Sequence, residues 1–210
     1  MEELDLLKKD WKKSENHFNQ VSENEIYTML HRKSSSIVKW ILIVSIIELV
    51  VWSALSLLGN MDDFLKKINH PELLMYFKVF SIFHYVVIAV LIYLFYRNYI
   101  NISTTSSTKE LMRSILRTRK TVQFYVWYNL AMIAISFVIG FTVNLVYNPE
   151  MDALLDKINN DGSFMAGILG GLTVCVLVFV GLFWAIYRLI YGMLLRKLLS
   201  NYKELKKIEL

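Results

Sequence analysis

The chain has 210 residues, of which 55% are hydrophobic, and its mean hydropathy of +0.41 excludes an ordinary soluble globular domain. The net charge of +5 comes from basic residues that flank apolar runs, which argues against nucleic-acid binding. The single cysteine, Cys175, excludes an intrachain disulfide and a cysteine metal site.

The N-terminal segment, residues 1–36, is charged and helical in pattern, and we expect cytoplasmic amphipathic helices there. One side of the first helix is apolar and carries Leu4, Leu7 and Trp11. This side favours either a cytosolic protein partner or the surface of the lipid bilayer. Ser22 and Glu25 have the spacing of a capping box and predict the start of a second helix.

Two apolar runs within residues 37–100 predict a first transmembrane hairpin. Glu48 and His84 lie near the middle of its two spans, at similar depth. A charged side chain there costs about 2.5–3.5 kcal/mol on membrane insertion. Two interpretations remain open: a proton- or cation-linked site formed by this pair, or polar groups that satisfy hydrogen bonds and fix helix packing. We prefer the second.

The loop of this hairpin contains the phrase MDDFLKKIN at residues 61–69, which recurs as MDALLDKIN in a later loop, with six of nine letters identical. In both copies the apolar residues share one helical face. This predicts short helices at 61–69 and 149–159 that lie on the external surface of the membrane. We therefore interpret the chain as two tandem hairpin repeats that cross the membrane in the same sense.

Residues 101–120 are expected to be a basic cytoplasmic loop, 121–190 a second transmembrane hairpin, and 191–210 a basic cytoplasmic tail. The two hairpin loops contain few basic residues, whereas the other connections and the termini contain many. The positive-inside rule therefore predicts a multi-pass membrane protein with both termini in the cytoplasm.

The fourth span has small residues along one face at Gly167, Gly171 and Gly181, and the first two form a GxxxG motif. Such residues let helix backbones approach closely, either within the chain or in a homodimer. We expect packing within the chain and keep the homodimer as the alternative. Aromatic residues near the inner surface predict interfacial anchors: Trp40, Tyr96, Tyr99, Tyr125, Trp127, Trp184, Tyr187 and Tyr191.

The sequence contains no GxSxG, P-loop, HExxH or metal-spaced carboxylate motif. Its histidines fall at four different depths: His17, His31, His70 and His84. We therefore expect no metal site, no cofactor and no enzymatic activity. The stretches LLKKDWKK and SENEIYTMLHRKSSSIVKWI, within about the first 50 residues, resemble the N-terminus of a group of uncharacterised bacterial four-span membrane proteins, some of them labelled carotene oxygenase-like. The resemblance carries no catalytic motif, so no site residue follows from it.

Together these patterns predict an all-α integral membrane four-helix bundle, and the resemblance implies that its membrane is a bacterial inner (cytoplasmic) membrane. The expected function is that of a noncatalytic membrane scaffold or regulatory protein that presents its cytoplasmic helices to a partner. The alternative is a small proton- or cation-linked transporter or channel subunit that uses Glu48 and His84.

Overall fold

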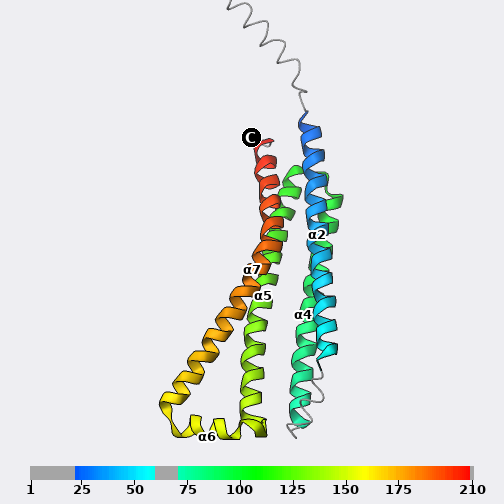
Figure 1. Ribbon diagram of the computed structural model, residues 1–210. Helices are drawn as coiled ribbons and strands as arrows, with labels where there is room; N and C mark the ends of the chain where they lie inside the picture. Colours follow the sequence, from blue (N-terminus) through cyan, green and yellow to red (C-terminus); the bar gives the residue numbers. More distant parts are fainter. Residues whose placement is uncertain (1–21, 60–70, 209–210) are drawn as a thin grey trace, which may run out of the picture.

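The computed structural model describes residues 22–59 and 71–208. Every regular element in these two ranges is a helix, which confirms the all-α prediction. Four long helices are joined by one short helical connection (Figure 1): α2 (Glu23–Leu58), α4 (Pro71–Thr104), α5 (Thr108–Tyr147), η1 (Pro149–Met151), α6 (Asp152–Asn160) and α7 (Gly162–Ile208).

The four long helices are each long and apolar enough to cross a membrane, by length and composition. They match the four spans predicted from the sequence and suggest a multi-pass membrane protein. At about 1.5 Å per residue, the 47 residues of α7 extend for about 70 Å, more than twice the thickness of a hydrocarbon core of about 30 Å. Each long helix therefore continues well beyond a single membrane crossing.

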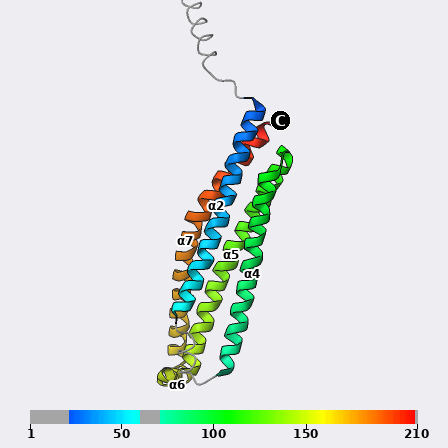
Figure 2. The same cartoon turned by 90° about the vertical axis from the view of Figure 1, so that its right-hand side faces the viewer.

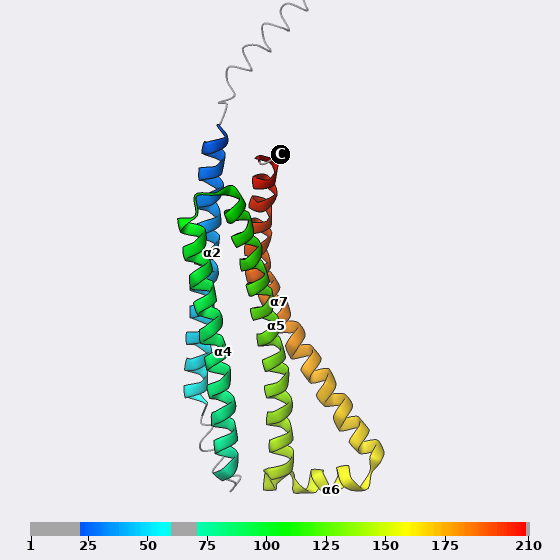
Figure 3. The same ribbon diagram turned by 180° about the vertical axis from the view of Figure 1, so that it is seen from behind.

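The long helices form an antiparallel bundle in which α2 contacts α4 and α7, and α5 contacts the same two helices. Figures 1 and 3 show the start of α2, the α4–α5 turn and the end of α7 at one end, which we call the terminal end; the opposite end, where α6 lies, is the α6 end. Figure 2 shows the four helices running almost alongside one another from this second side. At the terminal end, the Tyr27 hydroxyl donates to the Thr105 carbonyl at 3.1 Å, which connects α2 to the turn.

Buried side chains recur along each long helix at alternating spacings of three and four residues. This is the spacing of the core positions of coiled coils, and it places one continuous seam of each helix in the centre of the bundle. The seams are Ser34, Val38, Ile41 and Ser45 in α2; Ile88, Leu91, Phe95, Asn98 and Ile102 in α4; Leu111, Ile115, Thr118, Val122, Tyr125 and Asn129 in α5; and Tyr187, Tyr191, Leu198, Asn201 and Leu205 in α7, with half-buried Leu194 between.

This core is concentrated toward the terminal end. The hydrophobic cluster nearest that end is at most 2% exposed: Leu30, Val38, Ile102, Leu111, Ile115, Leu198 and Leu205. In contrast, none of the most apolar stretch of α7 is buried. Figures 1 and 3 show why, since α7 diverges from α5 toward the α6 end and α6 connects the two. The apolar surface of that half of α7 is therefore exposed.

The helix boundaries differ from several sequence expectations. The expected loop at 101–120 is largely helical, because only residues 105–107 interrupt α4 and α5. The expected tail at 191–210 continues α7 as far as Ile208. α2 also runs without a break past residue 36. In each case seam residues such as Ile115 and Leu198 are fully buried, so packing keeps these charged segments helical.

Two expected helix signals are confirmed. The Ser22–Glu25 capping box forms, with the Glu25 N–H donating to Ser22 Oγ at 3.3 Å and the Ser22 N–H donating to Glu25 Oε2 at 2.9 Å. The predicted helix at 149–159 corresponds to η1 and α6, and its half-buried residues are those of the predicted apolar face: Met151, Leu154, Leu155 and Ile158. The first copy of this phrase, 61–69, and the N-terminal residues Leu4, Leu7 and Trp11 lie outside the described residues.

Candidate functional site

Glu48 lies in the seam of α2, three residues after Ser45, and its side chain meets three tyrosine hydroxyls. Tyr125 of α5 donates to Glu48 Oε2 at 2.8 Å, and Tyr191 of α7 donates to the same oxygen at 3.1 Å. Tyr187 of α7 donates to Glu48 Oε1. We call these four residues the Glu48 cluster. It connects three of the four long helices through one carboxyl group.

Seam spacing explains how the tyrosines reach this point. Tyr187 and Tyr191 are one turn apart on α7, so both project toward α2. The ring of Tyr125 meets that of Tyr191 edge-on at 5.7 Å between centroids, and meets Phe95 in the same way at 5.4 Å. The rings therefore fill the apolar core, while the hydroxyls satisfy Glu48.

The Glu48 cluster consists of one half-buried carboxyl acceptor and three hydroxyl donors. A carboxyl group accepts hydrogen bonds through its oxygens, and three hydroxyls donate to this one. Such hydrogen bonds offset much of the penalty for taking a polar group out of water. The geometry thus supports the interpretation in which Glu48 fixes helix packing.

His84 has a different partner. Its Nδ1 atom lies 3.2 Å from the Tyr128 hydroxyl, and the two rings stack at 5.7 Å with an interplanar angle of 10°. The direct Glu48–His84 pair suggested by the sequence is therefore not formed. Glu48 and His84 nevertheless lie at a similar level of the bundle, because their respective partners, Tyr125 and Tyr128, are within one turn of each other on α5.

The glycines of α7 do not serve packing within the described part of the chain. A Cβ atom added at Gly167, Gly171 or Gly181 would have nothing within 4 Å. The expected close packing within the chain is therefore not seen at these three positions. Their use in a homodimer stays a prediction.

The aromatic residues divide into two groups. Trp40, Trp127 and Trp184 are exposed, and their role as anchors at a membrane interface stays a prediction. The anchor prediction is wrong for Tyr125, Tyr187 and Tyr191, which are core residues. The missed signal was their register, since each occupies a seam position of its helix. Across residues 22–59 and 71–208, no three His, Cys, Asp or Glu side chains converge as metal ligands.

No curated protein matches the chain, and no solved structure matches it. A family model described as a domain of unknown function, DUF8845, matches residues 24–210. This match includes all four long helices and every member of the Glu48 cluster. The chain therefore belongs to the DUF8845 family.

Proposed function

We propose that this protein is a noncatalytic scaffold or regulatory protein of a bacterial inner membrane. In this proposal two tandem hairpins cross the membrane, the terminal end lies in the cytoplasm, and α6 lies on the outer surface. The distribution of basic residues supports this orientation, because the α4–α5 connection and the end of α7 are rich in Lys and Arg. The exposed polar face and half-buried apolar face of α6 suit a helix lying at a membrane surface.

The observation that carries the scaffold role is the length of the packed core at the terminal end. Glu23 precedes the exposed interfacial residue Trp40 by seventeen residues, which is about 25 Å of helix. Over this distance the bundle keeps fully buried residues such as Leu111 and Leu205. A protein that needed only to cross the lipid would not require this extension, whereas a docking platform would.

The partner-binding surface proposed for this platform is the apolar side of the N-terminal segment, with Leu4, Leu7 and Trp11. To test it, a photocrosslinking amino acid is placed at position 7 or 11 of the full-length protein in cells. We expect a discrete crosslinked protein. The crosslink from position 7 should disappear with Trp11→Asp, and the crosslink from position 11 should disappear with Leu7→Asp. The control places the crosslinker at Asp10. Crosslinks to lipid alone, or equal crosslinks from position 10, would exclude the scaffold role.

A second candidate function is proton- or cation-linked transport through the Glu48 cluster. It is favoured by one observation, a carboxyl group inside a candidate membrane-spanning helix next to the His84–Tyr128 pair. The test uses purified protein in liposomes with an imposed proton or cation gradient. Transport requires a flux that Glu48→Gln abolishes and that a matched exposed variant, Glu150→Gln, leaves unchanged. A flux that is absent or insensitive to Glu48 removes this candidate.

A further inference from the structure

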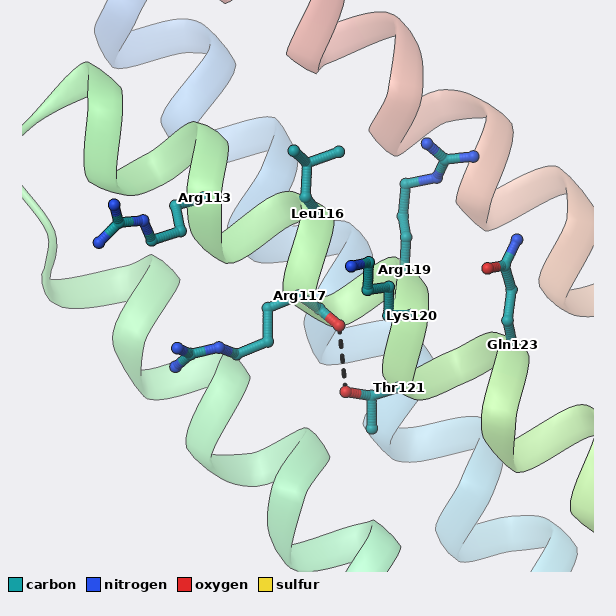
Figure 4. A pocket seen from close by; sticks show the side chains of 7 residues that line it. All are labelled: Arg113, Leu116, Arg117, Arg119, Lys120, Thr121 and Gln123. Carbon is teal, nitrogen blue, oxygen red and sulfur yellow. Dashed lines mark hydrogen bonds between the residues drawn. The ribbon is translucent and has the colours of Figure 1, made fainter.

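A cavity of about 550 Å³ lies on the surface of α5 near the terminal end. Its walls carry four cationic side chains and no carboxylate; the lining residues are Arg113, Leu116, Arg117, Arg119, Lys120, Thr121 and Gln123. Figure 4 shows Arg113 and Arg117 extending to the same side of α5, and Arg119 and Gln123 extending to the other. The charge is thus gathered on about two turns of one helix.

These cations are not paired with carboxylates of the described residues. Within the described ranges, none of the four takes part in an ion pair with a carboxylate. The Nε atom of Arg119 is buried and has no hydrogen-bond partner there. Like charges one turn apart, such as Arg113 and Arg117, repel each other. An anion from outside the chain, bound between Arg113 and Arg117, would relieve this repulsion.

The position of the cavity along the bundle axis indicates which kind of anion would occupy it. Glu48 and Tyr125 are hydrogen-bonded, and α2 and α5 both run toward the α6 end, so equal steps back along the two helices reach the same level. Trp40 lies eight residues before Glu48, and Arg117 lies eight before Tyr125. Trp40 is 56% exposed, as is typical of a residue at the level of lipid headgroups. The cavity therefore lies at the level of lipid phosphates.

The neighbouring surface suits the rest of a lipid molecule. Phe124, one turn beyond Lys120 toward the α6 end, is 60% exposed, and Trp127 is exposed in the next turn. A lipid whose phosphate occupies the cavity would extend its acyl chains in this direction. Arginine matches phosphate in a bidentate geometry, and basic pockets at this membrane surface bind anionic headgroups.

We propose that Arg113, Arg117 and Lys120, which share one face of α5, bind the phosphate of an anionic phospholipid. This inference rests on the proposed membrane insertion but not on the scaffold role or on any partner of the N-terminal segment. Free phosphate offers the same chemistry, and the experiment distinguishes the two sources.

The test uses native mass spectrometry of the full-length protein in detergent, titrated with phosphatidylglycerol or phosphatidylcholine. The variant Arg117→Gln/Lys120→Gln is compared with Arg196→Gln/Lys197→Gln, which removes the same charge. The control residues lie at a similar level of the bundle, because Arg196 is nine residues beyond Tyr187 on α7. Both Arg196 and Lys197 are exposed. Arg117→Lys, which keeps the charge, checks that a loss does not come from misfolding.

We expect wild type to retain phosphatidylglycerol in preference to phosphatidylcholine, and the cavity variant to lower that affinity by about tenfold or more. The α7 control should change it by less than about twofold, and Arg117→Lys should retain most of the binding. Equal losses in both double variants would overturn the site, since only general surface charge would then act. Displacement of the lipid by inorganic phosphate at equal concentration would overturn the lipid as its occupant.

Discussion

The Tyr125 hydroxyl donates to Glu48 Oε2 at 2.8 Å and so joins α5 to α2, two helices that lie across the bundle from each other. Glu48 is the acceptor for the two α7 tyrosines as well, so one side chain holds three helices in register. Packing continues beyond this level, since Leu130 and Met132 are buried and the rings of Phe137 and Phe179 lie 5.3 Å apart. The Glu48 cluster therefore joins α7 to the bundle before α7 diverges toward the α6 end (Figure 1).

Replacing Glu48 tests this structural role. Glu48→Leu would leave three buried hydroxyls without their acceptor, and we expect it to lower the free energy of unfolding by about 1–3 kcal/mol. Glu48→Gln keeps one carbonyl oxygen as an acceptor and should cost less. Both are measured by thermal unfolding in detergent. A Glu48→Leu protein as stable as wild type would show that the hydrogen bonds contribute nothing to packing.

The tyrosine hydroxyls should act together rather than singly. Tyr125→Phe removes one donor and keeps the ring, so we expect a loss of about 0.5–1.5 kcal/mol. The double variant Tyr125→Phe/Glu48→Gln should lose less than the sum of the two single losses, because they remove the same interaction. Strict additivity in this double-mutant cycle, with Phe137→Leu as a distant control, would contradict a shared hydrogen bond.

A polar layer nearer the terminal end offers a second test of the core. The Asn201 side-chain amide donates to Ser34 Oγ at 3.0 Å, and both residues are buried. Ser34→Ala leaves the amide unsatisfied, so we expect a loss of about 1–2 kcal/mol. Ser34→Ala/Asn201→Leu removes both polar groups and should recover most of that loss. The same thermal unfolding measurement gives the result. A double variant that is less stable than Ser34→Ala would contradict this role.

Asp161 gives a pH-dependent prediction at the start of α7. Its Oδ1 atom accepts the Ser163 hydroxyl at 2.6 Å and the Ser163 and Phe164 N–H groups at 2.9 and 3.3 Å. These hydrogen bonds, that of the Ser163 hydroxyl first, lower the pKa of Asp161 below its ordinary value. The cap therefore stabilises the helix start above the ordinary Asp pKa and is lost as the pH falls through the lowered one.

This cap is measured by hydrogen exchange of the Ser163 and Phe164 amides. We expect protection at neutral pH that Asp161→Ala removes and Asp161→Asn largely keeps, since the asparagine oxygen still accepts. An NMR titration that finds the Asp161 pKa at or above its ordinary value would contradict the hydrogen-bonded cap.

The glycines of α7 should tolerate side chains in the monomer. Because a Cβ at Gly171 would meet nothing within 4 Å, we expect Gly171→Ala to leave the free energy of unfolding unchanged or to raise it by up to about 1 kcal/mol. A large loss of stability would indicate a close helix contact at this position. If that loss depends on protein concentration, it would point to the homodimer.

Much of the architecture follows from local sequence features. Apolar runs of sufficient length predict the four long helices, and the Ser22–Glu25 spacing predicts the start of α2. The ends of the helices were harder to predict, because basic composition at 101–120 suggested a loop. There, Leu111 and Ile115 continue the buried seam, and tertiary packing outweighs the charged surface.

The candidate site was predictable only in part. Glu48 stands out in the sequence because a carboxyl group in an apolar span needs a partner. Which helices supply that partner depends on which seams face each other, so the sequence suggested His84 where the structure has Tyr125, Tyr187 and Tyr191. Tyr128, the partner of His84, was missed. Tyr187 and Tyr191 resembled interfacial anchors because tyrosine serves both in membrane interfaces and in cores, and only their register distinguishes the two.

The most direct test of the proposed membrane topology is cysteine labelling in intact cells with a membrane-impermeant maleimide. Cys175 is replaced by Ala, and single cysteines are introduced at Asp63, Asp156 or Ser106 in turn. We expect positions 63 and 156, in the two hairpin loops, to be labelled from outside, and position 106, in the α4–α5 turn, to react only after the cells are opened. Labelling of 63 and 156 from opposite sides, or of 106 from outside, would contradict two hairpins with a cytoplasmic terminal end.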